Sequence, residues 1–556
     1  MPSSLLRGVT VASCILMLLL LGGSTAIALS HEQPGPFGSL LFNADALYLP
    51  LFIQEVQTGG IDSLSGWVTP PANCFFPDGL LMLTARLAVH DPILSVFAYA
   101  LIQLFLFAWI GYLLSREISP ATPRTSVIFC TLASVTIVLL AGCYEQGSYN
   151  LSLALVSGYH LGSFLVALFN IYLFVKHVRT GNQVYLWLCI TSTSLALFSD
   201  TLHAIHFSLP FGITLLVIFK TANQQMRRAA IKLALGIVSS PLVAALLERL
   251  IRRATGITFF HLELFETLTG GISKGHLDLP ALAKGYNPWI ETVPGPIALI
   301  ALVWYGYLCF WRPTAQREEG DQARNVPAHV FKIYSISLFV LLLVFPIVTG
   351  LSGMNVTRYT TPFFLLPFLF IHLPALGLFS LGTRPFASLA TSGLVMLLFL
   401  CLVTVMPTNL NSPDRNPLVV QNQMQCILDV AKRHSIRIGF GDYWIAKPAS
   451  FFSRNALRIL QLEANMMPHY WISNYHWYFE LEKYPGNKIV VTRGLNRAPI
   501  VQHLGNPSLV ETCEGMELLV YRGPELGAVD RFGESLIQQI RVWEKLTGRR
   551  PYENVR

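Results

Sequence analysis

The sequence predicts a polytopic α-helical membrane protein with about eleven transmembrane helices, followed by a water-soluble α/β domain at the C-terminal end. Of its 556 residues, 53% are hydrophobic and only 13% are charged, and the mean hydropathy is +0.51. A water-soluble protein of this size keeps roughly a quarter of its residues charged. The missing charge leaves apolar runs of about 20 residues, the length that crosses a bilayer.

Apolar runs recur from the N-terminus to residue 405, and each is a candidate transmembrane helix. They span residues 9–29, 93–114, 126–141, 151–175, 184–198, 211–219, 231–247, 296–311, 333–348, 363–379 and 387–405. The first run has Arg7 as its basic flank, but about twenty residues is long for the core of a signal peptide. Because Ser30-His31-Glu32 also makes a poor cleavage site, we interpret this run as a retained anchor.

The basic residues of the short loops predict the orientation in an inner or plasma membrane. Alternate loops carry them: Arg116 and Arg124; Lys176 and Arg179; Lys220, Arg227, Arg228 and Lys232; Arg312, Arg317, Arg324 and Lys332; and Arg384. The positive-inside rule then places the N-terminus in the cytoplasm. Loops 30–92, 248–295 and 351–362 then face outward. Residues 1–406 contain all the apolar runs and form the transmembrane domain. Residues 407–556 follow the last run and form a periplasmic or extracellular domain. This bias explains most of the formal charge of +8, and we expect no nucleic-acid partner.

One outward loop departs from this bias. Arg249, Arg252 and Arg253 follow an apolar run and yet fall on the outer side. Three explanations remain open: an amphipathic helix on anionic headgroups, an anion site, or one miscounted helix.

The C-terminal domain has its own alternation of predicted elements. A helix is expected over Val420, Met424, Ile427 and Ala431, with strands at 436–440, 488–492 and 517–521. A last helix carries Phe532, Leu536, Ile540 and Trp543 on one face. The aromatic segments 442–444 and 471–479 suit stacking on sugar rings, but we favour packing in the core or on headgroups.

The nine cysteines show no metal-ligand spacing. Five lie in apolar runs, where cysteine behaves as a small hydrophobic residue. Cys426 and Cys513 both lie in the outward domain, where an oxidising compartment would allow a disulfide between them.

The first outward loop carries two aspartates next to apolar helical segments. Residues 45–56 place Leu47, Leu51 and Val56 on one helical stripe, with Asp45 at its N-terminal end. Asp78 follows Pro77 and precedes the apolar run 80–87. Each aspartate is either a catalytic base or metal ligand, or a cap of the following helix. The local pattern favours capping for both.

Other polar residues lie at the predicted outward ends of the helices. Glu145 lies between the third and fourth runs, and His160 lies inside the fourth, where an ionisable residue is a functional candidate. Asp200 and His203 lie one helical turn apart after the fifth run, and with His206 they suggest a metal site, although that spacing is commonplace. These residues are candidates for a substrate pocket.

Arg358, followed by Tyr359, is the one basic residue of its short outward loop. It runs against the positive-inside bias, and guanidinium groups bind phosphate in a bidentate manner. A phosphate-binding role and a headgroup anchor are the two interpretations, and we favour the first.

The sequence N-A-D-A-L-Y at residues 43–48, in a large outward loop after the first helix, resembles the GT-C superfamily of membrane glycosyltransferases. The order of many helices and a final outward domain is similar as well. This superfamily includes the aminoarabinose transferase and the protein O-mannosyltransferases. Its members transfer a sugar from a polyprenyl-phosphate carrier to a glycan, lipid or protein acceptor on the outer face.

The resemblance implies roles for particular residues. Asp45 matches the first-loop acidic residue, which acts as base for the acceptor or helps to hold a divalent cation such as Mg or Mn, and Asp78 resembles a second acidic residue of that loop. Arg358 and Tyr359 match the site of the lipid phosphate. Because alanine flanks Asp45 on both sides, the adjacent acidic pair of some members is missing, which weakens the expectation of a metal. The W-W-D signature of oligosaccharyltransferases is also missing, which disfavours oligosaccharide transfer to asparagine.

The sequence-based hypothesis is therefore an inverting hexosyl or pentosyl transfer, with Asp45 as base. A transporter or flippase is the first alternative, but the apolar runs hold few ionisable residues and we find no convincing internal repeat. A polysaccharide polymerase or ligase is the second alternative, favoured by the long loop 248–295. A scaffold without activity has the least support.

Overall fold

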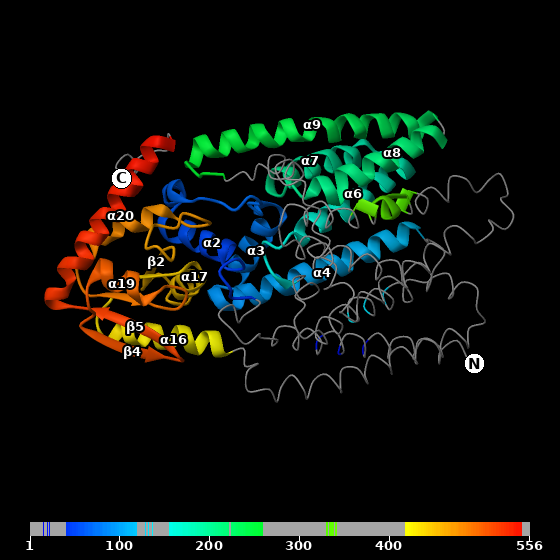
Figure 1. The fold of residues 1–556 in the computed structure, drawn as a ribbon. Helices are drawn as coiled ribbons and strands as arrows, with labels where there is room; N and C mark the ends of the chain where they lie inside the picture. The colour runs from blue at the N-terminus through cyan, green and yellow to red at the C-terminus, as the bar shows by residue number, and fades with distance from the viewer. Residues whose placement is uncertain are drawn as a thin grey trace, which may run out of the picture.

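The computed structural model describes residues 41–118, 155–221, 224–259 and 418–547, residues 330–341 except 332 and 339, and positions 15, 19, 22, 128, 132 and 136. The apolar helices lie together in one half of the molecule, and the C-terminal α/β domain lies beyond their ends (Figure 1). The first-loop helices lie between these two parts.

The described apolar half includes the helices α4 (Pro92–Ile118), α6 (Leu161–Thr180), α7 (Gln183–Ser199), α8 (Leu209–Thr221) and α9 (Gln224–Thr255), with a short π-helix, η4 (Ala204–Ser208), before α8. The described residues among 330–341 are helical as well. Three of the described helices are long and apolar enough to cross a membrane, namely α4, α6 and the part Met226–Thr255 of α9. The prediction of a polytopic helical membrane protein is confirmed in this form. The count of about eleven spans stays a prediction.

The predicted basic ends of two helices meet in space. Glu117, in the last turn of α4, accepts Lys176 Nζ at 2.6 Å and Arg179 Nη1 at 3.0 Å, both from the last turns of α6. The opposite ends of the helices lie against the first loop, where the Cys74 amide donates to the Ser199 carbonyl at the end of α7. The basic residues of α4 and α6 therefore lie away from the first loop, as the positive-inside pattern predicts.

Helix α9 contains Arg249, Arg252 and Arg253, the arginines that depart from the positive-inside bias. The apolar run 231–247 is only the middle of this helix, which continues without a break to Thr255. Beyond it, the Thr258 amide donates to the Trp67 carbonyl at 2.9 Å, so this end of α9 reaches the first loop. Arg252 pairs with Glu248 at 2.6 Å within the helix. The arginines therefore lie on the first-loop side, as the predicted order of helices requires, and a miscounted helix is not needed to explain them.

The first loop folds into short helices: α2 (Tyr48–Gly59), η1 (Ile61–Gly66), the π-helix η2 (Phe75–Gly79) and α3 (Leu80–Ala88). The helix predicted over 45–56 is confirmed, but it begins at Tyr48. Leu47 and Leu51 of the predicted apolar stripe are buried, and Val56 is partly buried.

The C-terminal domain is a five-stranded sheet with helices around it. Its elements are α16 (Leu418–Arg433), β1 (Ile438–Gly441), α17 (Tyr443–Phe452), β2 (Arg458–Gln461), η8 (Tyr475–Phe479), α18 (Glu480–Lys483), β3 (Lys488–Val491), α19 (Arg497–Leu504), β4 (Leu509–Cys513), β5 (Met516–Tyr521), η9 (Gly523–Glu525) and α20 (Leu526–Thr547). The strand order is β2-β1-β3-β5-β4. The first three strands of this order are parallel, and β5 is antiparallel to both β3 and β4.

A disulfide joins Cys426 of α16 to Cys513 at the end of β4, with the Cα atoms 5.7 Å apart. The sequence alone did not decide whether this disulfide forms, and the structure contains it. The aromatic segment 471–479 packs mostly in the core, because Ile472, Tyr475 and residues 477–479 are buried. The preference for core packing is thus confirmed for most of this segment.

The first loop and the C-terminal domain share a buried junction. Glu55 of α2 accepts Arg458 Nη1 at 2.9 Å and Trp477 Nε1 at 3.1 Å. The Arg458 guanidinium also lies 4.1 Å from the centre of the Trp477 ring. Trp67 packs edge-on against Trp477, with ring centres 5.7 Å apart. Because the ion pair is buried and hydrogen-bonded, we infer that the loop and the domain are held in one fixed arrangement.

Candidate functional site

Asp45 lies in a turn that residues from the apolar half hold in place. The Asn43 Oδ1 atom accepts the Ala46 amide at 2.9 Å and the Tyr159 hydroxyl at 3.2 Å. Ser157 Oγ donates to the Ala46 carbonyl at 3.0 Å. The segment just before α6 therefore fixes the backbone on both sides of Asp45.

The C-terminal domain contacts Asp45 from another direction. The Tyr443 hydroxyl donates a hydrogen bond to Asp45 Oδ1, and Lys447 Nζ donates to the Ala44 carbonyl at 3.2 Å. Tyr443 and Lys447 are four residues apart on α17, so they share one face of the helix. Asp442 caps this helix by accepting the Ile445 amide at 3.0 Å. Asp45 is therefore the point at which three segments, distant in sequence, meet.

Next to Asp45 lies a lysine whose side chain is buried, which is unusual for a charged residue. Asp45 is partly exposed, whereas Lys447 is 1% exposed and lies 4.0 Å from the centre of the Tyr443 ring. Burial lowers the pKa of Lys447 to about 7, and the nearby Asp45 opposes this effect. A large share of the Lys447 amine is therefore neutral near pH 7.

Neither first-loop aspartate caps a helix, so the capping interpretation was wrong for both. Leu47 is the residue before α2, and its helix end has no side-chain cap. Gly79 precedes α3 and cannot cap it through a side chain. Asp45 and Asp78 instead use their carboxylates in tertiary contacts.

Asp78 lies in a second cluster, against the membrane helices. Its side chain is 3% exposed, and Oδ1 accepts the Tyr99 hydroxyl of α4 at 2.6 Å. A Cβ atom at Gly162, in the first turn of α6, would overlap the Asp78 carboxylate. Burial raises the pKa of Asp78 to about 7, and the charge of Asp200 adds to the increase. Asp78 therefore keeps its proton to a higher pH than an exposed aspartate does, and it is enclosed by helices.

His160 and Asp200 form a buried pair next to Asp78. His160 Nδ1 lies 2.8 Å from Asp200 Oδ2, and the Leu202 amide donates to the other Asp200 oxygen at 3.0 Å. His160 directly precedes α6, with φ of 67°, and Asp200 directly follows α7. The prediction that His160 lies inside a transmembrane helix was therefore wrong, because the helix begins at Leu161.

The suggested metal trio after α7 does not form a ligand set. Asp200 faces His160, while His203 Nδ1 and His206 Nδ1 lie 3.1 Å from the carbonyl and hydroxyl oxygens of Ser163. Across the described parts of the chain, no group of three or more His, Cys, Asp or Glu side chains is arranged to hold a metal. Asp200 and His203 are neighbours in the structure, but they act in different contacts.

A divalent cation at Asp45 does not fit the side chains described around it. Mg²⁺ and Mn²⁺ take several oxygen ligands. The groups at Asp45 are one carboxylate, a phenol hydroxyl that donates to it, and a buried amine. A cation at this site stays an expectation from the sequence.

Glu145, Arg358 and Tyr359 lie outside the described residues. The approach of Asp45 and Arg358, on which the phosphate site depends, therefore stays a prediction. Among the described candidates, Asp78, His160 and Asp200 come together, and Asp45 lies in a separate set of contacts.

Sequence reasoning missed Tyr443 and Lys447. Tyr443 stood within an aromatic segment that we expected to serve packing. A signal for Lys447 was present, because it is the one charged residue of the apolar helix Y-W-I-A-K-P-A-S-F-F. A lysine in such a helix is buried only when a partner receives its charge or when its pKa falls.

Comparisons with known proteins gave structural similarity only. No protein-family model matches the chain, and no curated protein sequence matches it. The structure is similar to a crystal structure of ArnT from Cupriavidus metallidurans in the apo state, with a TM-score of 0.45 and 13% identity over 91% of this chain and 97% of that chain. It is also similar to ArnT from the same organism bound to undecaprenyl phosphate, with a TM-score of 0.46 and 13% identity over 92% of this chain and 98% of that chain.

Proposed function

We propose that this protein is an integral membrane glycosyltransferase that moves a hexosyl or pentosyl group from a polyprenyl-phosphate carrier to an acceptor hydroxyl. The observation that carries the proposal is the setting of Asp45. It is a partly exposed carboxylate, oriented by Tyr443 and held at the meeting point of the first loop, the apolar half and the C-terminal domain. An oriented carboxylate beside a membrane is well suited to act as a general base.

The proposed reaction is a single displacement. The acceptor hydroxyl gives its proton to the Asp45 carboxylate while its oxygen attacks the anomeric carbon of the sugar. The bond from that carbon to the phosphate oxygen breaks, and the phosphate leaves with the electron pair, so the configuration inverts. General-base assistance of this kind contributes roughly 10²–10⁴-fold to the rate.

The protein has to stabilise the charge on the departing lipid phosphate. We assign this role to Arg358 and Tyr359, as the sequence resemblance implies. A guanidinium would bind two phosphate oxygens and neutralise the charge that develops on them. Tyr443 is a positioning residue, because its hydroxyl fixes one oxygen of the Asp45 carboxylate.

The orientation that this reaction requires has support from two features. The cations of the α4 and α6 ends lie away from the first loop, which favours a cytoplasmic location for those ends. The disulfide between Cys426 and Cys513 suits an oxidising compartment, which favours a periplasmic or extracellular C-terminal domain. We therefore propose that transfer occurs on the outer face of the membrane.

A transporter or flippase is the rival function, and one observation favours it. Asp78, His160 and Asp200 form a buried titratable cluster at the ends of membrane helices, and such clusters often mark proton or solute paths. Under this alternative the solute crosses the membrane unchanged, and Asp45 takes no part in chemistry.

A transfer assay on the purified full chain separates these functions. Polyprenyl-phosphate monosaccharides are supplied as donors with candidate glycan, lipid and protein acceptors, with and without EDTA, and the glycosylated product is measured. Asp45→Asn should lower the turnover of product by about 10²–10⁴-fold at unchanged melting temperature. Asp62→Asn is the matched control, because Asp62 is exposed in the same loop. Full activity of Asp45→Asn would remove Asp45 from the mechanism, and loss with EDTA would support a cation.

A further inference from the structure

The C-terminal sheet has a topological switch point between β1 and β3. These two strands are parallel neighbours, and β2 lies on the other side of β1. The chain leaves β1 through α17 toward β2, whereas it leaves β3 through α19 toward β4, on the opposite side of the sheet. In open α/β sheets, ligands bind in the crevice beyond the carboxyl ends of the strands at such a point. Here those ends lead into Asp442 and into residues 492–494.

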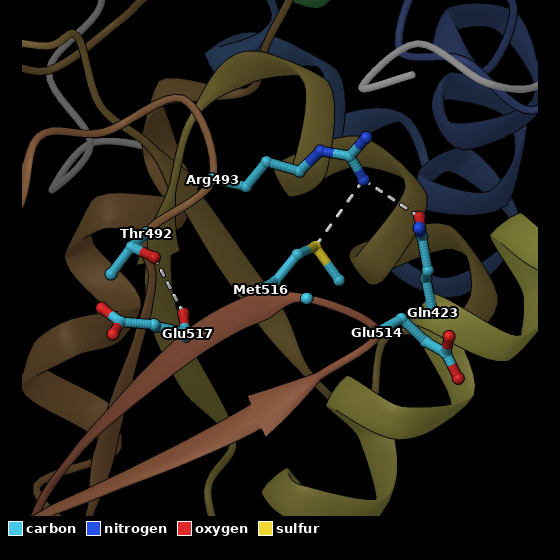
Figure 2. A pocket seen from close by; sticks show the side chains of 7 residues that line it. Gln423, Thr492, Arg493, Glu514, Met516 and Glu517 are labelled. Carbon is cyan, nitrogen blue, oxygen red and sulfur yellow. Dashed lines mark hydrogen bonds between the residues drawn. The ribbon is translucent and has the colours of Figure 1, made fainter. Parts of the chain in front are cut away.

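A cavity of about 390 Å³ lies beside the carboxyl end of β3, on the side of its neighbour β5. It is large enough for a small ligand, since small-molecule sites usually have volumes of roughly 300–1,000 Å³. Its walls come from α16, from the end of β3 and from the turn between β4 and β5 (Figure 2). The lining residues are Gln423, Thr492, Arg493, Glu514, Gly515, Met516 and Glu517.

Arg493 is held in a defined position in this cavity. Its Nη1 atom donates to Gln423 Oε1 at 3.0 Å and to Met516 Sδ at 3.7 Å. Figure 2 shows the guanidinium and the Gln423 amide pointing toward one another. The next residue, Gly494, has φ of +77°, and a Cβ atom there would overlap the Asp442 carboxylate. Only glycine therefore lets the chain carry Arg493 past Asp442 at this position.

The charges around the cavity largely compensate each other. Arg493 and Asp442 interact electrostatically, and Glu517 pairs with Arg497 at 3.2 Å. Glu514 adds a further carboxylate to the lining. An anion bound beside Arg493 would face these carboxylates, whereas a neutral ligand with many hydroxyls would find donors and acceptors on every wall.

This cavity is next to the candidate base along the chain. Asp442, which touches Gly494, directly precedes Tyr443, whose hydroxyl donates to Asp45. The N-terminal end of α17 therefore interacts electrostatically with the lining residue Arg493 through Asp442, and it contacts Asp45 through Tyr443. A ligand in the cavity would lie on the side of the domain that carries Tyr443.

We propose that this cavity is an acceptor-binding site that holds a neutral, hydroxyl-rich sugar ring through Arg493 and Gln423. The site would hold a glycan acceptor at the domain that orients Asp45. This inference rests on the proposed function for the identity of its ligand as an acceptor. The binding of a sugar ring is a separate property, which can be measured without any transfer reaction.

Saturation-transfer NMR on the full chain in detergent tests the site, with the methyl glycosides of glucose, mannose and arabinose as probes. We expect binding of at least one glycoside, weakened roughly tenfold or more in Arg493→Ala, because a hydrogen bond to a charged group is lost. Gln423→Ala should weaken binding in the same direction, and it gives the answer if Arg493→Ala does not fold. Arg522→Ala, an exposed arginine in the same domain, is the matched control and should bind as the unmodified protein does.

Three results would overturn the proposal: no glycoside binds, the Arg493 and Gln423 variants bind as tightly as the unmodified chain, or inorganic phosphate displaces the glycosides competitively. The last result would identify an anion site instead. Asp45→Asn should keep glycoside binding while losing transfer. If Asp45→Asn keeps transfer, the proposed function fails, yet the loss of glycoside binding in Arg493→Ala would still establish the sugar site.

Discussion

Asp45 and Asp78 occupy the same loop and look alike in sequence, yet the structure places them in opposite settings. Asp45 is partly exposed and receives a hydrogen bond from the C-terminal domain. Asp78 is 3% exposed and receives its hydrogen bond from Tyr99 of a membrane helix. The difference teaches that the local pattern of an aspartate before an apolar helix does not decide its role. The partner that reaches it from elsewhere in the chain does.

The largest expected effect concerns the junction on which the Asp45 setting depends. Glu55→Ala removes the nearer of the two carboxylates that pair with the buried Arg458 guanidinium and leaves only Glu480, at 3.5 Å. Removal of one partner of a buried pair costs roughly 3–5 kcal/mol. Chemical denaturation of the full chain should show this loss, together with loss of transfer. Glu482→Ala is the control, because Glu482 pairs with Arg541 at the surface at 3.7 Å, where roughly 1 kcal/mol or less is expected. Equal losses in the two variants would mean that the junction does not hold the domain.

Tyr443→Phe tests whether the contact from the C-terminal domain orients the Asp45 carboxylate. It removes the hydroxyl that orients the carboxylate, and a hydrogen bond to a charged group contributes roughly 1.5–3 kcal/mol. We expect kcat to fall about 10- to 100-fold with little change in the KM for the donor. Tyr484→Phe serves as control, since Tyr484 lies in the same domain, where its ring packs against Arg437. A change in KM alone would show that Tyr443 binds substrate instead of positioning Asp45.

Gly162→Ala tests the enclosed setting of Asp78. The added methyl group would overlap the carboxylate, and overpacking of this kind costs roughly 1–3 kcal/mol. The melting temperature should fall. Gly212→Ala, in α8, has open space around its Cβ position and should leave the melting temperature nearly unchanged. If both variants melt alike, the Asp78 pocket is looser than described.

The last expected effect is a pH dependence of stability to which Asp78 should contribute. Burial raises its pKa from 3.8 to about 7, so the folded state binds this proton more tightly than the unfolded state. Its contribution to stability is therefore largest below 3.8 and is lost as the pH rises toward about 7. Asp78→Asn should flatten this part of the melting-temperature profile. Identical slopes in both proteins would place the titration on another group.

Much of the fold follows from periodicity in the sequence. The helix α16 and the strands β1, β3 and β5 lie within about two residues of their predicted positions, and the apolar face of α20 is buried. The strand β2, R-I-L-Q, was missed because it is short and has only two apolar residues; all four of its residues are nevertheless buried by neighbouring elements. The strand β4, L-V-E-T-C, was missed because its apolar and polar residues do not alternate along the sequence.

The candidate site was predictable only in part. Asp45 was identified through the sequence resemblance of residues 43–48, because its local pattern alone favoured a helix cap. Tyr443 lies 398 positions away along the chain, and no local pattern reports such a contact. His160 was placed inside a helix because hydropathy does not show where a helix begins. Its positive φ and its pairing with Asp200 arise from the packing of α6 against α7.

The separation of Asp45 from Tyr443 has a consequence for biosynthesis. Synthesis proceeds from the N-terminus, at roughly 5–20 residues per second, so the first loop leaves the ribosome long before residue 443 is made. During that interval the carboxylate has not yet received the phenol that orients it. In a partly synthesised chain the Asp45 carboxylate would therefore lack its orienting contact, which would form only after α17 has been made.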